Sequence, residues 1–243
     1  IAIGTLSGNT SQGSSSVAIG YWAGNSAQGS SAIAIGNLAG NTNQTLNAIS
    51  IGTQAGGYAQ GSESVALGYR SGLVSQGLQS VAIGSNAGTY NQKTSAIAVG
   101  NQAGNNIQGI GSIAIGDNSG YTGQDVNAVA IGVQAGYCGQ KMGGIAMGYQ
   151  AGYSLQGTGS IAIGYQAGYT GQGTGAVAIG YQAGYNPQQM GGVAIGLSAG
   201  NRNQGTGAVA IGFAAGNFTQ GANAIAIGTY SGSTGQAANS IVI

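Results

Sequence analysis

Side chains that could do acid–base, nucleophilic or metal chemistry are scarce in this sequence and lie far apart. The chain has no histidine, and its three acidic residues are Glu63, Asp117 and Asp125. General base catalysis most often uses an imidazole, and glycoside hydrolysis needs two carboxyl groups side by side. The single cysteine, Cys138, cannot form a disulfide within the chain. We therefore predict that the protein is not an enzyme and holds no cofactor or metal ion.

The glycines and the basic residues do not indicate a phosphate or nucleic-acid site. The chain has 52 glycines but neither a GxxxxGK[ST] nor a GxGxxG sequence. A nucleic-acid surface needs clustered basic residues, whereas the four in this chain are isolated: Arg70, Lys93, Lys141 and Arg202. No apolar run approaches the roughly 18 residues of a membrane span. We expect no nucleic-acid partner and no membrane insertion.

Glutamine recurs every 16 residues, which is the most specific polar feature of the sequence. In a regularly stacked chain these amides could hydrogen-bond to one another or to backbone groups of a glycine-rich loop. We predict an internal structural ladder, and the alternative is a row of amides that contacts sugar or ice. The row consists of Gln12, Gln28, Gln44, Gln60, Gln76, Gln92, Gln108, Gln124, Gln140, Gln156, Gln172, Gln188, Gln204, Gln220 and Gln236.

Tyrosines form two shorter rows with the same spacing, beside Gln150, Gln166 and Gln182. Aromatic side chains in such a row could stack on sugar rings or contact a partner protein. They could also stack on one another and shield a loop and a sheet edge. We treat both rows as the candidate surface binding stripe. Its members are Tyr121, Tyr137, Tyr153, Tyr169 and Tyr185 in one row, and Tyr149, Tyr165 and Tyr181 in the other.

The spacing of these rows comes from a 16-residue repeat that runs through the chain without insertion or deletion. Fifteen complete units precede residues 241–243, which open a sixteenth. With Ile1 as position 1, that position is always Ile or Val, and position 2 is Ala except at Ser50 and Val242. Positions 4 and 8 are Gly, position 7 is Ala or Ser, and position 12 is Gln. Such regularity predicts that each unit stacks on the next.

The unit length and composition favour β-structure. A helical hairpin needs roughly 33 residues, and two glycines per unit disfavour helix. Branched residues at positions 1 and 3 favour extended chain. We predict an all-β fold, a parallel β-solenoid of fifteen 16-residue coils. In each coil we expect one strand ending at position 3, a bend at position 4, a second strand over positions 5–7, and a return loop over positions 9–15.

Side chains alternate along the first strand, so positions 1 and 3 share one face and position 2 lies on the other. We expect the Ile/Val face to be the interior of the coil. The alanine face is also kept small, and we infer that it is packed as well. It could pack against another layer of the same coil or against another chain.

The segments Ser64–Gly68, Ser80–Gly84 and Ser160–Gly164 resemble the head repeats of YadA-type trimeric autotransporter adhesins. The resemblance covers the whole chain, because every unit carries a version of this segment. It implies a left-handed parallel β-roll in which three chains associate side by side as a homotrimer. It also implies an adhesive role at a surface. Similar repeats occur in fibres of phages and large viruses.

Composition, repeat and resemblance together predict a non-enzymatic surface fibre. We expect residues 1–243 to form a single β-roll repeat domain, as a fragment or module of a longer fibre. Multivalent attachment to a host cell or surface would follow from repeated weak contacts. The expected partners are the chain itself, as a homotrimer or an end-to-end filament, and a host surface glycan or protein. The expected location is extracellular, on a cell or virion surface. An ice-binding β-solenoid and a purely mechanical extracellular filament are the alternatives.

Overall fold

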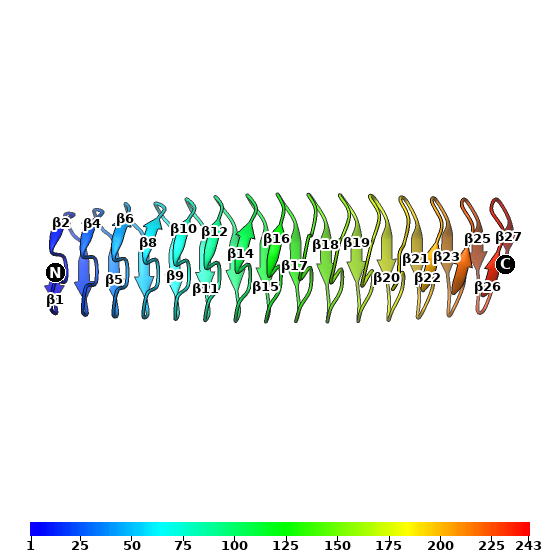
Figure 1. Ribbon diagram of the computed structural model, residues 1–243, viewed down its shortest axis with the longest axis horizontal. Helices are drawn as coiled ribbons and strands as arrows, with labels where there is room; N and C mark the ends of the chain where they lie inside the picture. Colours follow the sequence, from blue (N-terminus) through cyan, green and yellow to red (C-terminus); the bar gives the residue numbers. More distant parts are fainter. The chain divides into compact units, whose positions relative to one another are not determined.

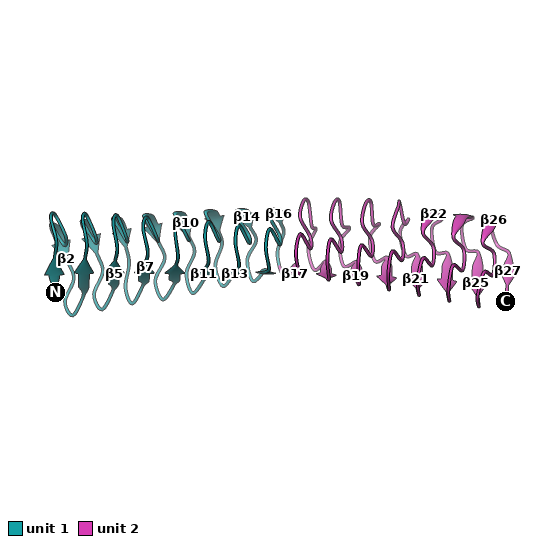
Figure 2. Ribbon diagram, turned by 90° about the horizontal axis from the view of Figure 1, so that it is seen from below, with its two compact units in different colours: residues 1–126 teal, residues 127–243 magenta.

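The computed structural model describes all residues, Ile1–Ile243. As the repeat predicts, the chain forms an all-β parallel solenoid of about 15 turns without a helix. No element therefore has the helical length and apolarity that crossing a membrane would need. The chain divides into two compact units, Ile1–Val126 and Asn127–Ile243, which Figure 2 colours separately. Within each unit, successive coils lie side by side (Figure 1).

Unit 1 contains two parallel sheets, and each coil contributes one strand to each sheet. Neighbouring coils pair in constant register, for example Ala82 with Ala98. The first sheet has the order β1 (Ala2–Ile3), β3 (Val17–Ile19), β5 (Ile33–Ile35), β7 (Ile49–Ile51), β9 (Val65–Leu67), β11 (Val81–Ile83), β13 (Ile97–Val99) and β15 (Ile113–Ile115). The second has the order β2 (Thr10–Gln12), β4 (Ser26–Gln28), β6 (Thr42–Gln44), β8 (Tyr58–Gln60), β10 (Val74–Gln76), β12 (Tyr90–Gln92), β14 (Asn106–Gln108) and β16 (Thr122–Gln124).

Unit 2 keeps the first type of sheet but has a shorter second one. Its first-sheet strands are β17 (Val129–Ile131), β18 (Ile145–Met147), β19 (Ile161–Ile163), β20 (Val177–Ile179), β21 (Val193–Ile195), β23 (Val209–Ile211), β25 (Ile225–Ile227) and β27 (Ile241–Val242). Its second sheet contains β22 (Arg202–Gln204), β24 (Phe218–Gln220) and β26 (Thr234–Gln236). Between Cys138 and Gln204 the corresponding positions are joined by isolated bridges, such as Ser154 with Thr170.

Where a coil has a second strand, it lies at positions 10–12 of the repeat, so our prediction of a strand over positions 5–7 is wrong. Positions 5–8 form a turn instead. In the coil that begins at Val81, this turn covers residues 85–88. It contains two left-handed residues, Asn86 with φ 53° and Gly88 with φ 51°. Positive φ angles do not belong to the extended region, so they end the strand and turn the chain back. The expected return loop thus contains the second strand, and that strand carries Gln at position 12.

The first strand is oriented opposite to our prediction: the alanine face is the interior, and the Ile/Val face points outward. Ala82 is completely buried, whereas Ile35 and Leu67 are 36% and 41% exposed. The interior alanine at position 2 packs against the alanine at position 7. One such cluster contains Ala82, Ala87, Ala98, Ala103 and Ala114. The alternation itself is confirmed, and the alanine face packs against another layer of the same coil. The layers lie too close together for Ile or Val to occupy this side.

Two glycines per coil allow this close packing. Gly84, at position 4, has φ +124°, and a Cβ placed there would lie 2.5 Å from the carbonyl oxygen of Gly100 in the next coil. Gly88, at position 8, has φ +51°, and its Cβ would lie 2.8 Å from the Gln92 Oε1 atom. Residues with a Cβ are disfavoured at such angles. The first glycine therefore lets coils approach, and the second makes room for the interior glutamine.

Candidate functional site

The glutamines at position 12 lie inside the coils and connect the opposite side of each coil to its first strand. Gln44 and Gln108 are 0% exposed. The Nε2 atom of Gln44 donates to the carbonyl oxygen of Ile33 at 2.7 Å and to that of Ala48 at 3.1 Å. Ile33 is the first residue of this coil and Ala48 is its last. One side chain on β6 therefore reaches across the interior to both ends of its coil, beside β5. The same pair of bonds recurs along the chain, for example at Gln220.

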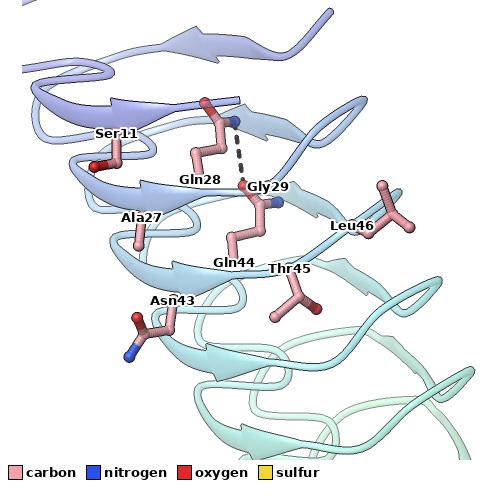
Figure 3. Close-up of a pocket in the computed structure, with 8 residues that line it drawn as sticks. All are labelled: Ser11, Ala27, Gln28, Gly29, Asn43, Gln44, Thr45 and Leu46. Atoms are coloured by element: carbon pink, nitrogen blue, oxygen red, sulfur yellow. Dashed lines mark hydrogen bonds between the residues drawn. The ribbon is translucent and has the colours of Figure 1, made fainter. Parts of the chain in front are cut away.

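Some of these amides also bond to the next coil. Gln28 Nε2 donates to Gln44 Oε1 at 3.2 Å; Figure 3 draws this bond between the two stacked side chains. The amide oxygens are less uniformly paired than the nitrogens. The Oε1 atoms of Gln76 and Gln92 are buried and accept no hydrogen bond. A buried carbonyl oxygen left without a donor costs free energy.

The serine at position 2 supplies the missing donor in one coil. The Ser50 hydroxyl donates to Gln60 Oε1 at 2.5 Å, and both residues are completely buried. This contact gives a physical reason for the exception to alanine that the sequence shows at Ser50. A polar residue is stable in an alanine core here because its partner lies directly opposite.

The tyrosine rows of unit 2 are stacks of nearly parallel rings. In the row at position 9, ring centroids are 5.0 Å apart for Tyr137 with Tyr153 and for Tyr153 with Tyr169, and 4.9 Å apart for Tyr169 with Tyr185. In the row at position 5, centroids are 5.0 Å apart from Tyr149 to Tyr165 and from Tyr165 to Tyr181. The position-5 rings are exposed and the position-9 rings half-buried. Tyr121, the remaining predicted member, lies half-buried in unit 1.

A second glutamine row, at position 6, runs beside the position-5 tyrosines. Gln150 Nε2 donates to Gln134 Oε1 and Gln166 Nε2 to Gln150 Oε1, both at 2.8 Å, and Gln182 Nε2 to Gln166 Oε1 at 2.9 Å. We did not predict this hydrogen-bonded row from the sequence. Its signal is the recurrence of Tyr-Gln-Ala-Gly at one phase of the repeat in three consecutive units.

The two tyrosine rows are close enough to affect each other electrostatically. Burial raises the pKa of Tyr169, and the neighbouring hydroxyls of Tyr153, Tyr185 and Tyr149 raise it further. A phenolate there would be poorly solvated and would face other oxygen atoms. Tyr149 belongs to the position-5 row, so both rows contribute to this shift.

The ionisable residues do not come together into a reactive group. No cluster of three or more His, Cys, Asp or Glu side chains that could hold a metal ion forms in the chain. The Glu63 carboxylate accepts from Gln79 Nε2 at 2.9 Å, and the Asp117 carboxylate accepts from Asn101 Nδ2 at 2.9 Å. These contacts join side chains of adjacent coils on the surface.

A shallow groove of about 420 Å³ runs beside the second sheet of unit 1. Figure 3 shows Ser11, Ala27 and Asn43 in a row on one side of it and Leu46 on the other. The residues that line it carry no ionisable group. A ligand in this groove would contact apolar and neutral polar groups but no reactive side chain.

The outward side chains of the first-sheet strands, at positions 1 and 3 of the repeat, form an apolar strip along each unit. In unit 1 the exposed fraction is 36% for Ile35 and 38% for Ile115. In unit 2 it is 36% for Ile163 and 37% for Ile195. Soluble proteins seldom leave such a continuous apolar surface uncovered.

One known family matches part of the chain. A family model described as the YadA head domain repeat matches in two copies over residues 156–168. No curated protein sequence matches the chain. The YadA head is a structural adhesin domain rather than an enzyme, and it is exposed at the cell surface. The matched residues include Ser160–Gly164, one of the segments on which the resemblance rests. The match therefore supports YadA-like head repeats in a chain that folds as a parallel β-solenoid.

Proposed function

We propose that this protein is a structural and adhesive surface fibre module that works as a side-by-side homotrimer. The observation that supports this most strongly is the distribution of apolar side chains. The interior holds alanine and glutamine, whereas the large aliphatic side chains lie outside in the apolar strip. A chain of this kind gains little hydrophobic stabilisation until another surface covers the strip.

A second copy of the chain is the partner that fits the strip best. Every coil presents the same short apolar segment in the same register, so a surface with the identical repeat matches it at every step. Covering a side chain such as Ile or Val contributes up to about 1.5–3 kcal/mol, less for half-buried positions. Summed over many coils, even small contributions give a stable association. The YadA head repeat supports three copies rather than two, because these heads form trimers.

The interior glutamines have a structural role in this proposal. Their amides close each coil from within, and they are buried. They are therefore not offered to an external sugar or ice surface. The residues that we assign to contact with a host surface are the tyrosines of the candidate stripe, which lie on the outside of unit 2 with the exception of Tyr121.

Attachment would arise from many weak contacts presented together. A trimer carries three copies of each contact surface, and the effective concentration at a second contact rises once the first has formed. Such a module works outside a cell or on a virion and needs no catalytic group. Its partner in this proposal is a glycan or protein of the host surface.

Bead attachment to host-cell monolayers tests this proposal. Beads coated with the chain should attach, and beads coated with Ile83→Lys/Ile115→Lys/Ile163→Lys should not, because charges in the apolar strip would separate the copies. Three exposed residues at position 14 serve as matched controls, and Ser14→Lys/Thr158→Lys/Thr206→Lys should attach normally. Equal attachment by both lysine variants would contradict the role of the strip. A trimer that attaches to no cell type would favour the mechanical-filament alternative.

A further inference from the structure

The outer surface of unit 2 carries a feature that self-association does not explain. We define the tyrosine stripe as three rows of side chains: the stacked tyrosines at position 5, those at position 9, and the glutamines at position 6, which hydrogen-bond from one coil to the next. Its members are Tyr137, Tyr153, Tyr169 and Tyr185; Tyr149, Tyr165 and Tyr181; and Gln134, Gln150, Gln166 and Gln182. Position 5 in unit 1 holds two tyrosines, Tyr21 and Tyr69, which do not lie in consecutive coils and so form no such stack.

Stacking determines which part of each ring can contact a ligand. Adjacent rings are nearly parallel, with an interplanar angle of 5° for Tyr165 with Tyr181 and 4° for Tyr169 with Tyr185. Their faces are therefore covered by the neighbouring rings. Ring edges and hydroxyl groups remain for a ligand, and each hydroxyl can donate one hydrogen bond and accept others. The stripe is thus suited to a partner with many hydroxyls rather than to a flat apolar one.

The glutamine row adds polar groups that are already held in place. Each bond from Nε2 to the next Oε1 uses one N–H and part of one oxygen. A second N–H remains on each amide of Gln150, Gln166 and Gln182, and these side chains are half-buried. Groups fixed before binding lose less conformational entropy when a ligand arrives. The row therefore offers donors at regular intervals along unit 2.

The stripe carries no charge that would select a charged partner. Residues 142–201, which contain most of it, include no Asp, Glu, Lys or Arg. Strongly acidic glycans and charged peptide segments would find no counter-charge there. The recognised groups must be neutral hydroxyls, amides and carbon–hydrogen surfaces.

The spacing of the stripe selects a ligand with a matching repeat. Polar groups recur with the coil, at the ring separation of 4.9–5.0 Å. A sugar ring in an extended β-1,4-linked chain advances by nearly the same distance. We propose that the tyrosine stripe of unit 2 binds a neutral, linear β-1,4-linked polysaccharide that lies across successive coils, with about one sugar per coil. This inference rests on the proposed attachment function and names its ligand class.

Calorimetric titration with four neutral β-1,4-linked hexasaccharides, built from glucose, N-acetylglucosamine, mannose or xylose, tests the inference. At least one should bind, and its affinity should increase from disaccharide to hexasaccharide as more coils are engaged. Added salt should leave the affinity unchanged, because no charges take part. Absence of binding by all four hexasaccharides would overturn the inference, and so would an affinity that does not depend on chain length.

The matched variant removes hydroxyls and keeps the stack. Tyr149→Phe/Tyr165→Phe/Tyr181→Phe should lower the affinity about tenfold or more, while Tyr21→Phe/Tyr69→Phe in unit 1 should leave it unchanged. Light scattering checks that both variants keep the molar mass of the parent chain. Unchanged binding by the triple variant would overturn recognition through these hydroxyls.

The bead assay separates this inference from the broader proposal. If coated beads attach to cells but no hexasaccharide binds, the glycan inference is wrong and the attachment proposal stands. If, in addition, the triple Phe variant abolishes bead attachment, the stripe contacts a protein instead. If beads fail to attach while a hexasaccharide binds in the expected way, the site is supported and host-cell attachment is contradicted.

Discussion

The coils of unit 1 and the coils over residues 133–196 of unit 2 differ in the contacts between successive coils on the side opposite the first sheet. In unit 1, the second sheet is continuous from β2 to β16. In the unit 2 segment, the same positions are joined only by isolated bridges, and stacked tyrosines run beside them. The first sheet and the interior glutamines are the same in both regions.

The residue at position 11 contributes to the difference in one coil. Leu155 and Gly171 at this position donate backbone hydrogen bonds to the previous coil at 3.0 Å. Pro187 occupies the same position in the next coil and has no N–H to donate. The coil is therefore held by its first strand and its interior glutamine, and the second strand can vary.

The largest effect should come from position 4, where both regions are equally crowded. Gly84→Ala in unit 1 and Gly164→Ala in unit 2 would each place a Cβ 2.5 Å from a carbonyl oxygen of the next coil. Backbone strain and overpacking together should lower the free energy of unfolding by about 4 kcal/mol. Gly159→Ala is the control, because its Cβ would meet nothing within 4 Å and should cost about 1 kcal/mol. Denaturant titration measures the free energy of unfolding of all three variants. If Gly164→Ala were as stable as the parent chain, position 4 would not be equally crowded in the two regions.

Loss of an interior glutamine should have the next largest effect. Gln92→Ala and Gln156→Ala would each remove one of the donors to buried backbone carbonyl oxygens and open a cavity. The free energy of unfolding should fall by about 3 kcal/mol. We expect Gln156→Ala to cost at least as much as Gln92→Ala, since fewer strand contacts support its coil. Exposed Gln189→Ala should stay within about 0.5 kcal/mol of the parent. Hydrogen exchange around each site measures the difference. A smaller cost in unit 2 would show that the tyrosine stack, not the glutamine, holds that region.

Removing a tyrosine should matter in unit 2 and not in unit 1. Tyr169 makes two ring stacks, so Tyr169→Ala should cost about 2 kcal/mol. Tyr69 is exposed to 51% and belongs to no stack, so Tyr69→Ala should change stability by less than about 0.5 kcal/mol. Thermal unfolding of the two variants tests the comparison. Equal effects would mean that the stack adds nothing beyond burial.

A gain of stability is expected where a glutamine oxygen lacks a donor. Ala82→Ser would place a hydroxyl near Gln92 Oε1, as Ser50 does for Gln60. Ala162→Ser would do the same for Gln172 in unit 2. Each should add about 1 kcal/mol to the free energy of unfolding, equally in both regions. Ala162→Gly, which cannot supply a donor, is the control and should destabilise. A loss with serine would show that the interior has no room for the hydroxyl.

The smallest effect is a pH dependence confined to the tyrosine stack. The pKa of Tyr169 is raised in the folded chain, so folding favours the neutral phenol. This contribution is complete below the unfolded pKa, near 10, and is lost as the pH rises through the folded pKa. Alkaline titration followed by ultraviolet absorbance should show late ionisation in the parent chain and not in Tyr169→Phe. Early ionisation of all tyrosines would contradict the stack.

The fold could be predicted from the repeat, but the arrangement of its faces could not. The triplets such as Val81–Ile83 predict strands because branched residues recur at one phase. They do not show which face is inside. Position 2, as at Ala82, and position 3, as at Ile83, both keep one type of apolar residue in almost every unit, so either face could be packed. The strand at positions 10–12 was missed because its residues, as at Ser26–Gln28, are polar and vary between coils. Positive φ angles at non-glycine residues such as Asn86 could not be predicted, because many different residue types occupy these positions.

The most direct test of the account is the molar mass of the chain in solution, by light scattering after size exclusion. The outward apolar strip predicts that copies of the chain associate, and the proposal from the YadA head repeat is that three chains form one particle. The expected mass is three times 23.3 kDa, falling to one chain in the Ile83→Lys/Ile115→Lys/Ile163→Lys variant. A parent chain that is monomeric, with the apolar strip exposed to water, would contradict the account.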